Sequence, residues 1–163
     1  MMLGQLFCAL GKAFGGCKPD IPLKPVTDLT TISRSEFLAE MAKVGIQPID
    51  LGTPLDSVMS ITSESELERI APYLVYPADW YIGDLQIDCE DYALQAQCDA
   101  AFKFHVSGVR LGLGWMPLGY HGFPVTLSKQ GNVWLMEPNA GFPYAGEWFT
   151  IGANSYLPNR VLA

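Results

Sequence analysis

Apolar residues recur at helical spacing in three segments, 33–45, 63–74 and 89–105, and this period predicts three helices. The first segment, "SRSEFLAEMAKVG", opens with Ser33 and Glu36 three residues apart, which is the pattern of a capping box. The second segment, "SESELERIAPYL", repeats the same device. We therefore expect capped helices at both places.

The third segment is the most apolar of the three and predicts a central helix. Its main predicted face consists of Leu94, Cys98, Ala101, Phe102 and His105. Four further residues widen that face: Ala93, Ala96, Ala100 and Phe104. On this interpretation Cys98 is a small core residue.

Short runs rich in β-branched and aromatic residues follow, at 108–116, 121–128 and 132–139, and they predict strands. The sequence "KQGN" between the last two runs predicts a hairpin turn. Helices followed by a meander of antiparallel strands predict an α+β fold whose sheet covers the central helix.

We expect an extended N-terminal arm over residues 1–32 and one folded domain over residues 33–163. The arm is rich in glycine and proline but carries apolar residues, so it either folds back on the domain or docks on a partner. Docking would make residues 1–30 the contact to another protein or to a second copy of the chain. Cys8 and Cys17 could pair with each other or across chains.

Charge and composition exclude several classes of function. The net charge is −7, and the ten Lys and Arg residues are scattered, so we expect no binding to nucleic acid. No run of eighteen apolar residues occurs, so we expect no membrane-spanning helix. The four cysteines form no C-x-x-C pair, and we expect neither a metal nor a cofactor.

Cys89 is the candidate nucleophile. Asp88 is a good N-cap and Asp91 stands at the box position, so Cys89 becomes about the first helical residue. The partial positive charge at a helix N-terminus lowers the pKa of a thiol, whereas Glu90 and Asp91 oppose ionisation. A nearby histidine would decide between these effects.

Helix geometry decides which histidine can reach Cys89. His105 lies roughly 24 Å away along the same helix, and Cys98 lies about 13 Å away, so neither can partner Cys89. His121 remains, at the start of a predicted strand. Across the "KQGN" hairpin, Glu137 stands opposite or nearly opposite His121 and could orient its imidazole.

These residues resemble a known pattern: "DCEDYAL", a strand-opening His in "YHGFPVTL", then "WLMEPN". The chain resembles the transglutaminase-like cysteine enzymes of the papain-like superfamily, most closely the bacterial transglutaminase-like cysteine proteinases. The resemblance implies a papain-like or transglutaminase-like fold, in which a central helix with the Cys at its N-terminus packs on an antiparallel sheet. Two positions depart from the pattern, since Glu137 replaces the usual Asp and Gly122 follows the histidine.

The resemblance also implies roles for the residues. Cys89 attacks an amide carbonyl to form a thioester, His121 moves the proton, and Glu137, or else Asn139, orients the histidine. The backbone N–H of Cys89 is the expected first oxyanion donor. Side chains just upstream are candidates for the second donor: Gln86, Tyr81 and Trp80.

Two functions follow as expectations. The first is a cysteine peptidase or amidase acting on a peptide or protein, for instance on an isopeptide bond of the bacterial cell envelope. The second is a structural protein, with residual activity or none, docked by its arm in an assembly such as a phage virion. The four tryptophans are interpreted as core or cleft wall rather than as a platform for sugars.

Overall fold

A computed structural model of the chain describes residues 23–49, 56–83 and 86–163. The α-helices in these residues are α2 (Arg34–Lys43), α3 (Glu64–Ile70) and α4 (Cys89–Phe104). Short 3-10 helices are η1 (Ala71–Tyr73), η2 (Ala78–Trp80) and η3 (Ala153–Ser155). Within the described ranges, no helix combines the length and the apolar character needed to cross a bilayer.

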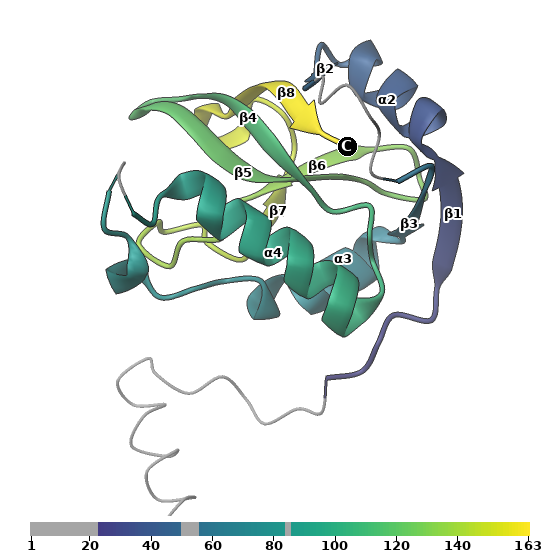
Figure 1. The fold of residues 1–163 in the computed structure, drawn as a ribbon, viewed down its shortest axis with the longest axis horizontal. Coiled ribbons are helices and arrows are strands. Elements are labelled where there is room, and N and C mark those ends of the chain that lie inside the picture. The colour runs from purple at the N-terminus through teal and green to yellow at the C-terminus, as the bar shows by residue number, and fades with distance from the viewer. Residues whose placement is uncertain (1–22, 50–55, 84–85) are drawn as a thin grey trace, which may run out of the picture.

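The strands form two sheets (Figure 1). Their bounds are β1 (Leu29–Ser33), β2 (Gln47–Pro48), β3 (Val58–Thr62), β4 (Arg110–Met116), β5 (Gly119–Leu127), β6 (Val133–Met136), β7 (Trp148–Phe149) and β8 (Leu157–Leu162). The larger sheet has the order β2-β8-β4-β5-β6-β7, and β1 pairs only with β3. Every pairing is antiparallel except that of β2 with β8.

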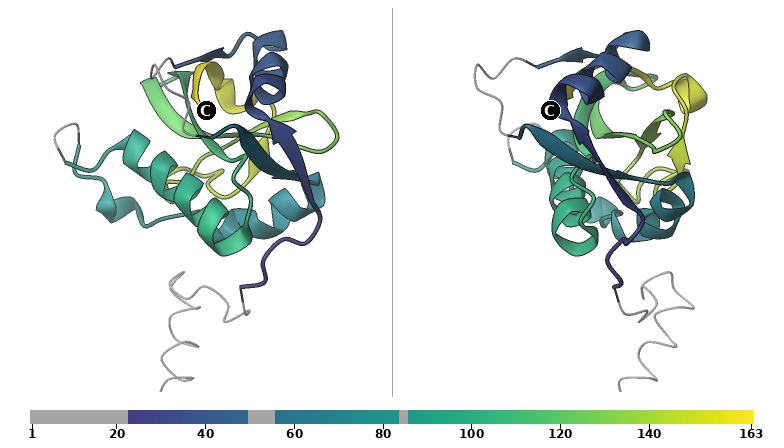
Figure 2. Two further views of the ribbon diagram at one scale, coloured as in Figure 1. Left: turned by 45° about the vertical axis from the view of Figure 1, so that its right-hand side comes forward. Right: turned by 90° about the vertical axis from the view of Figure 1, so that its right-hand side faces the viewer.

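Helix α4 lies along one face of the larger sheet, against β4 and β5, and α2 lies near the other face (Figures 1 and 2). One cluster of buried residues joins Phe37 and Met41 of α2 to the sheet. A second cluster lies on the α4 side and includes Leu67 and Ile70 of α3. The sheet is therefore apolar on both faces. Helix α4 packs against the sheet and shares its buried cluster with α3.

The predicted order of helices followed by strands is wrong. Three strands, β1 to β3, are interleaved with the first two helices, and β8 inserts beside β4 from the C-terminus. The two-residue strands β2 and β7 are too short to show a period of two. Strand β8, "LPNRVL", carries a proline and polar residues typical of a loop.

The capping box predicted for α2 is confirmed. The Ser33 hydroxyl accepts from the Glu36 N–H at 3.2 Å, and the Ser33 N–H donates to the Glu36 carboxylate at 2.9 Å. The box predicted for α3 is wrong. Ser63 is the N-cap, but its side chain makes no capping bond, and the Glu66 carboxylate pairs with Arg69 instead.

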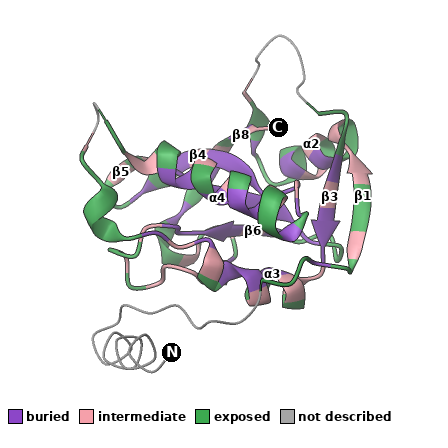
Figure 3. Cartoon of the chain, turned by 60° about the horizontal axis from the view of Figure 1, so that its bottom comes forward, coloured by how far each residue is buried: buried purple, intermediate pink, exposed green. Residues whose placement is uncertain are grey.

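The buried face of α4 differs from the main face that the apolar spacing predicted (Figure 3). Its buried residues are Tyr92, Ala93, Ala96, Asp99, Ala100 and Phe104. Cys98 is exposed and Phe102 is 84% exposed, so the prediction of Cys98 as a core residue is wrong. Three alanines on the buried face let the helix approach the sheet closely, which larger side chains on that face would prevent.

The last residues of the predicted arm belong to the folded domain. Residues 29–32 lie in β1, and the N–H of buried Val26 donates to the carbonyl of Phe104 at 3.1 Å. Residues 1–22, with Cys8 and Cys17, lie outside the described residues. The docking function of the arm therefore stays a prediction.

Candidate functional site

Cys89 is the first residue of α4, as the sequence predicted. Asp88 is the N-cap, and its backbone N–H donates to the Asp91 carboxylate at 3.2 Å. The backbone N–H of Cys89 is among the first four of the helix, which have no intrahelical acceptor. The thiol and a helix-start amide N–H therefore belong to the same residue.

The predicted contact between His121 and Glu137 is confirmed. The hairpin register pairs Val125 with Leu135, and continuing it places Glu137 diagonally across from His121, on the same face. A carboxylate on a longer side chain can span this diagonal, and His121 Nε2 lies 2.8 Å from Glu137 Oε2. The His121 side chain is only 12% exposed, and that of Glu137 is 1% exposed.

Glu137 receives two further hydrogen bonds. The Tyr156 hydroxyl donates to the same Oε2 at 2.6 Å, and the backbone N–H of Asn139 donates to Oε1 at 2.8 Å. Burial, followed by the Glu137 carboxylate, raises the pKa of Tyr156 above its ordinary value, so the hydroxyl stays a donor. Sequence reasoning missed Tyr156, because it comes from a turn near the C-terminus with no local motif.

Of the two predicted partners of His121, Glu137 makes the hydrogen bond to the imidazole, and the side chain of Asn139 bonds elsewhere. The Asn139 amide oxygen accepts from the backbone N–H of Gly141 at 2.8 Å and so fixes the turn after β6. Asn139 still lines the cleft that contains His121. Its backbone, not its side chain, acts on Glu137.

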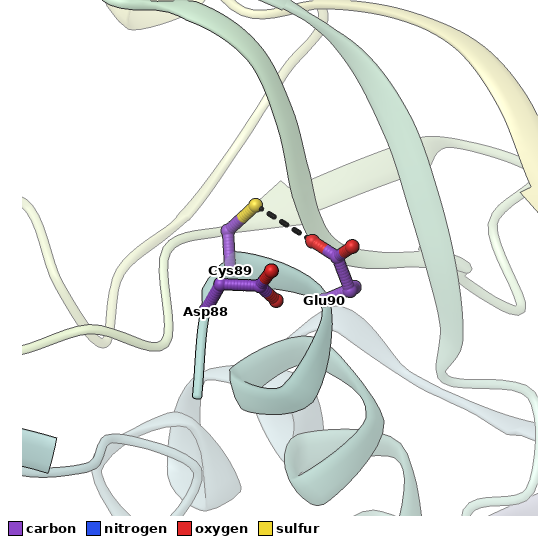
Figure 4. A group of neighbouring side chains, drawn as sticks. All are labelled: Asp88, Cys89 and Glu90. Atoms are coloured by element: carbon purple, nitrogen blue, oxygen red, sulfur yellow. Dashed lines mark hydrogen bonds between the residues drawn. The ribbon is translucent and has the colours of Figure 1, made fainter. Parts of the chain in front are cut away.

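The thiol of Cys89 donates a hydrogen bond to the carboxylate of Glu90 (Figure 4). Sγ lies 3.1 Å from Glu90 Oε2, and the backbone N–H of Gly122 donates to Sγ at 3.2 Å. Burial raises the pKa of Cys89 to about 12, the Glu90 carboxylate adds to the rise, and the Gly122 N–H opposes it. Burial and Glu90 therefore outweigh the lowering effect that the helix N-terminus was expected to have on the pKa of Cys89. The thiol is protonated at neutral pH.

Gly122 explains how β5 reaches the start of α4. A Cβ on Gly122 would lie 3.0 Å from both Cα and N of Glu90 and 3.3 Å from the carbonyl carbon of Cys89. Backbone atoms cannot move away as a flexible side chain can, so a larger residue would push the strand from the helix. The glycine after His121, which departs from the sequence pattern noted above, thus has a packing reason.

Cys89 and His121 line one cleft with a volume of about 660 Å³. Of the three predicted oxyanion donors, Tyr81 lines this cleft, and Trp80 and Gln86 are not among its described lining residues. Trp80 is 49% exposed and stacks on Tyr76 at 5.8 Å between ring centroids. Tyr81 is therefore the one of these three residues that lines the cleft of Cys89 and His121.

Asp88, Cys89 and Glu90 offer three possible metal ligands within 4.8 Å of one another. Asp88 Oδ1 is buried and accepts no hydrogen bond from any residue that the structure describes. Burial, followed by the neighbouring Glu90 carboxylate, raises the pKa of Asp88. The donor set of two carboxylates and one thiol could hold a cation, and the expectation of no metal stays a prediction.

His105 lies at the opposite end of α4 from Cys89, as predicted. It is the C-cap residue in the left-handed region, with φ of 66°, and its N–H donates to Ala101. The geometric exclusion of His105 as a partner of Cys89 is confirmed. Of the two histidines in the chain, only His121 reaches the cleft.

No protein-family model matches the chain, and no curated protein matches it. Solved structures do. PSL1a, in a complex with E64, superposes with a TM-score of 0.56 at 15% identity, over 82% of this chain and 51% of that chain. Polyporus squamosus lectin, bound to the human-type influenza-binding epitope Neu5Acα2-6Galβ1-4GlcNAc, gives 0.55 at 14% identity, over 82% and 49%.

These matches correct the fold assignment. The prediction of a papain-like or transglutaminase-like fold is wrong, because the chain shares its mixed, strand-rich fold with PSL1a and the lectin. Motifs around Cys89 and His121 carried that prediction, and they cover less than half of the chain and none of β1, β2, β3 or β8. The chain spans about half the length of the two structures that it matches.

Proposed function

We propose that the chain is a cysteine-dependent amide hydrolase acting on a peptide or protein, with Cys89 as nucleophile. One observation carries the proposal: the Cys89 thiol and the His121 imidazole line the same cleft, and buried Glu137 holds the imidazole at 2.8 Å. Nucleophile, base and orienting acid in this order form the arrangement of nucleophilic catalysis.

The reaction needs the thiol to turn from Glu90 toward His121. Since Nε2 of His121 bonds Glu137, Nδ1 is the ring nitrogen left to accept the thiol proton. Because the pKa of Cys89 is raised, proton transfer accompanies attack, and no thiolate is stored beforehand. Glu90 thus keeps the nucleophile protonated until a substrate enters.

In the first half of the reaction, Sγ bonds to the amide carbon as its proton passes to His121. The imidazolium then returns that proton to the amide nitrogen, the C–N bond breaks, and an amine leaves a thioester on Cys89. In the second half, His121 takes a proton from water as the hydroxide attacks the thioester carbon. The C–S bond then breaks, the imidazolium returns the proton to Sγ, and a carboxylic acid leaves the restored thiol. The Cys89 backbone N–H and Tyr81 are the candidate donors to the oxyanion.

Reaction with E64 tests the proposal without knowledge of the substrate. PSL1a, which shares this fold, is found in a complex with E64. E64 carries an epoxide that a thiol sulfur opens, forming a thioether as the ring oxygen takes a proton. We expect one adduct per chain, mapped by peptide mass spectrometry to Cys89.

Matched variants separate catalysis from ordinary thiol reactivity. His121→Ala should slow labelling at least about 100-fold, because the base is lost, whereas His105→Ala should leave it unchanged. Exposed Cys98 serves as an internal reference. Labelling of Cys98 at the rate of Cys89, or equal labelling of the His121→Ala variant, would rule out the hydrolase.

Carbohydrate binding is a second candidate function. It is favoured by the likeness to a lectin bound to a sialylated trisaccharide, and by the half-exposed ring of Trp115 next to the cleft. Because about half of each matched structure lies outside the superposed region, the likeness does not place a sugar site in this chain. Calorimetric titration with Neu5Acα2-6Galβ1-4GlcNAc tests it, and no heat of binding at millimolar sugar would reject it.

A further inference from the structure

Three large apolar side chains form a row across three strands of the sheet. In the strand register, Trp115 of β4 stands opposite Tyr120 of β5 and opposite Leu157 of β8. Directly opposed residues project from the same face of a sheet, and the rings of Trp115 and Tyr120 meet at 5.2 Å. Their exposed fractions are 56%, 47% and 55%, so this row, which we call the apolar shelf, is open to solvent.

The apolar shelf lies on the face of the sheet that α4 covers elsewhere. Gly122 points toward the start of α4, since a Cβ there would meet Glu90 at 3.0 Å. Tyr120 is two residues earlier in the same strand and therefore on the same face. The hairpin of β4 and β5 runs past the start of α4, where the helix no longer covers it (Figure 1).

The shelf is continuous with the cleft that contains Cys89. Tyr120 belongs to both, and Leu113, Met116 and Leu118 extend the apolar lining of the cleft toward the hairpin turn. Leu118, at that turn, is 80% exposed. An occupant of the shelf can therefore extend into the cleft that Cys89 lines.

The charges of the cleft narrow the occupant further. Asp88 and Glu90 line it, and no lysine or arginine is among its described lining residues. A cationic group on a ligand is favoured near these carboxylates. The occupant is apolar along the shelf.

We propose that the apolar shelf binds aromatic or aliphatic side chains of a peptide substrate, on one side of the amide that Cys89 attacks. This inference rests on the proposed hydrolase function and adds the class of substrate. It assigns specificity to Trp115, Tyr120 and Leu157, which touch the substrate but not its reacting atoms.

Two other occupants fit the shelf less well. A sugar needs hydrogen-bond partners beside the aromatic ring, but Leu157 and Leu118 offer none and the Tyr120 hydroxyl already bonds Asn159 at 2.9 Å. A second copy of the chain needs roughly 800 Å² per partner. Three half-exposed side chains offer on the order of 300 Å².

Binding to the Cys89→Ala variant of the full chain tests the shelf apart from catalysis. The probes are capped seven-residue peptides of alanine and serine, with one phenylalanine moved through each position, measured by calorimetry. We expect one or two adjacent phenylalanine positions to tighten binding at least about tenfold over the peptide without phenylalanine. Adding Trp115→Ser should abolish that gain.

Phe102→Ser is the matched control, because Phe102 is 84% exposed but lies on α4 outside the cleft lining. It should leave the gain intact. Equal affinity for all peptides, or a gain that survives Trp115→Ser, overturns the shelf proposal. So does a preference for the sialylated trisaccharide, or a dimer in solution that Trp115→Ser dissociates.

Failure of the shelf and failure of the hydrolase are distinguishable. If E64 labels Cys89 but phenylalanine brings no gain, only the shelf proposal falls. If E64 leaves Cys89 unmodified, the hydrolase falls whatever the peptides do.

Discussion

Tyr156 donates a hydrogen bond of 2.6 Å to Glu137, at the carboxylate oxygen that also bonds His121. Tyr156 is fully buried, and its ring meets the His121 ring edge to face at 5.9 Å. It does not line the cleft. In the proposed mechanism, Tyr156 is thus a positioning residue, which acts on His121 through the Glu137 carboxylate.

Replacing Tyr156 with Phe tests that role. The variant leaves Glu137 with the donors His121 and Asn139 only, so the carboxylate gains freedom to rotate. We expect kcat for a cleaved peptide to fall about tenfold with KM unchanged, since Tyr156 touches no substrate. Loss of one hydrogen bond to a buried charge should lower the free energy of unfolding by about 1–3 kcal/mol.

Tyr144→Phe is the matched control. The Tyr144 hydroxyl donates to the Tyr156 hydroxyl at 3.4 Å, its one hydrogen-bond partner among the described residues, and so lies one hydrogen bond further from His121. It should cost stability and leave kcat nearly intact. A second readout comes from nuclear magnetic resonance of His121 Nε2–H, whose signal should move in Tyr156→Phe but not in Tyr144→Phe. No movement in either variant would make Tyr156 purely structural.

Replacing Glu137 with Gln removes the charge beside His121 and keeps the size of the side chain. An amide cannot fix the imidazole tautomer or stabilise the imidazolium as a carboxylate does. We expect kcat to fall at least about 100-fold, measured on the best peptide, with KM little changed. Glu147→Gln, at an exposed glutamate, is the control, and full activity of Glu137→Gln would remove Glu137 from the mechanism.

The pairing of His121 with Glu137 could be predicted from the sequence, because a short hairpin fixes the register of two strands around its turn. The position of Cys89 at a helix start followed in the same way from Asp88 and the acids after it. Both arguments use residues that are close in sequence or joined by one turn.

Tyr156 could not be predicted, because it reaches Glu137 across 19 residues and through no local repeat. Strand β8 was missed for a related reason, since Pro158 and Arg160 hide its pattern and its pairing with β4 is long-range. The main face predicted for α4 was wrong, since Phe102 is exposed, whereas Ala96 and Phe104, which the sequence placed at the margin of that face, are buried. Hydrophobicity alone does not distinguish Phe102 from Phe104, because only the packing of the helix on the sheet decides which of the two is buried.

Replacing Glu90 with Gln should make Cys89 more reactive. The carboxylate raises the pKa of the thiol by accepting a hydrogen bond from it and by its negative charge, so its removal lowers that pKa. At a pH well below the pKa, the thiolate fraction rises about tenfold when the pKa falls by about one. We expect iodoacetamide to alkylate Cys89 about tenfold faster at about pH 7.5, and the pH profile to move to lower pH.

Cys98 in the same molecule provides the reference rate, and Glu40→Gln is the matched control, since Glu40 pairs with Lys43 on α2. The alkylation rate of Cys98 should not change in Glu90→Gln, and that of Cys89 should not change in Glu40→Gln. Because burial is the larger cause of the raised pKa, the pH profile of Cys89 in Glu90→Gln should still lie above that of an ordinary thiol. A slower reaction in Glu90→Gln would mean that Glu90 does not hold the thiol protonated.

Replacing Gly122 with Ala should separate the two halves of the site. The new Cβ would lie 3.0 Å from backbone atoms of Glu90, so β5, which carries His121, must shift away from Cys89. We expect the free energy of unfolding to fall by about 1–3 kcal/mol, and E64 labelling to slow at least about tenfold. Gly112→Ala is the control, because its Cβ would crowd β5 itself, at the Val125 side chain (3.0 Å) and the Phe123 carbonyl (3.2 Å), and none of its nearest contacts is in α4. Gly112→Ala should lose comparable stability but keep the normal rate of E64 labelling at Cys89. Equal labelling rates in the two variants would show that the close approach of β5 to α4 does not govern the reactivity of Cys89.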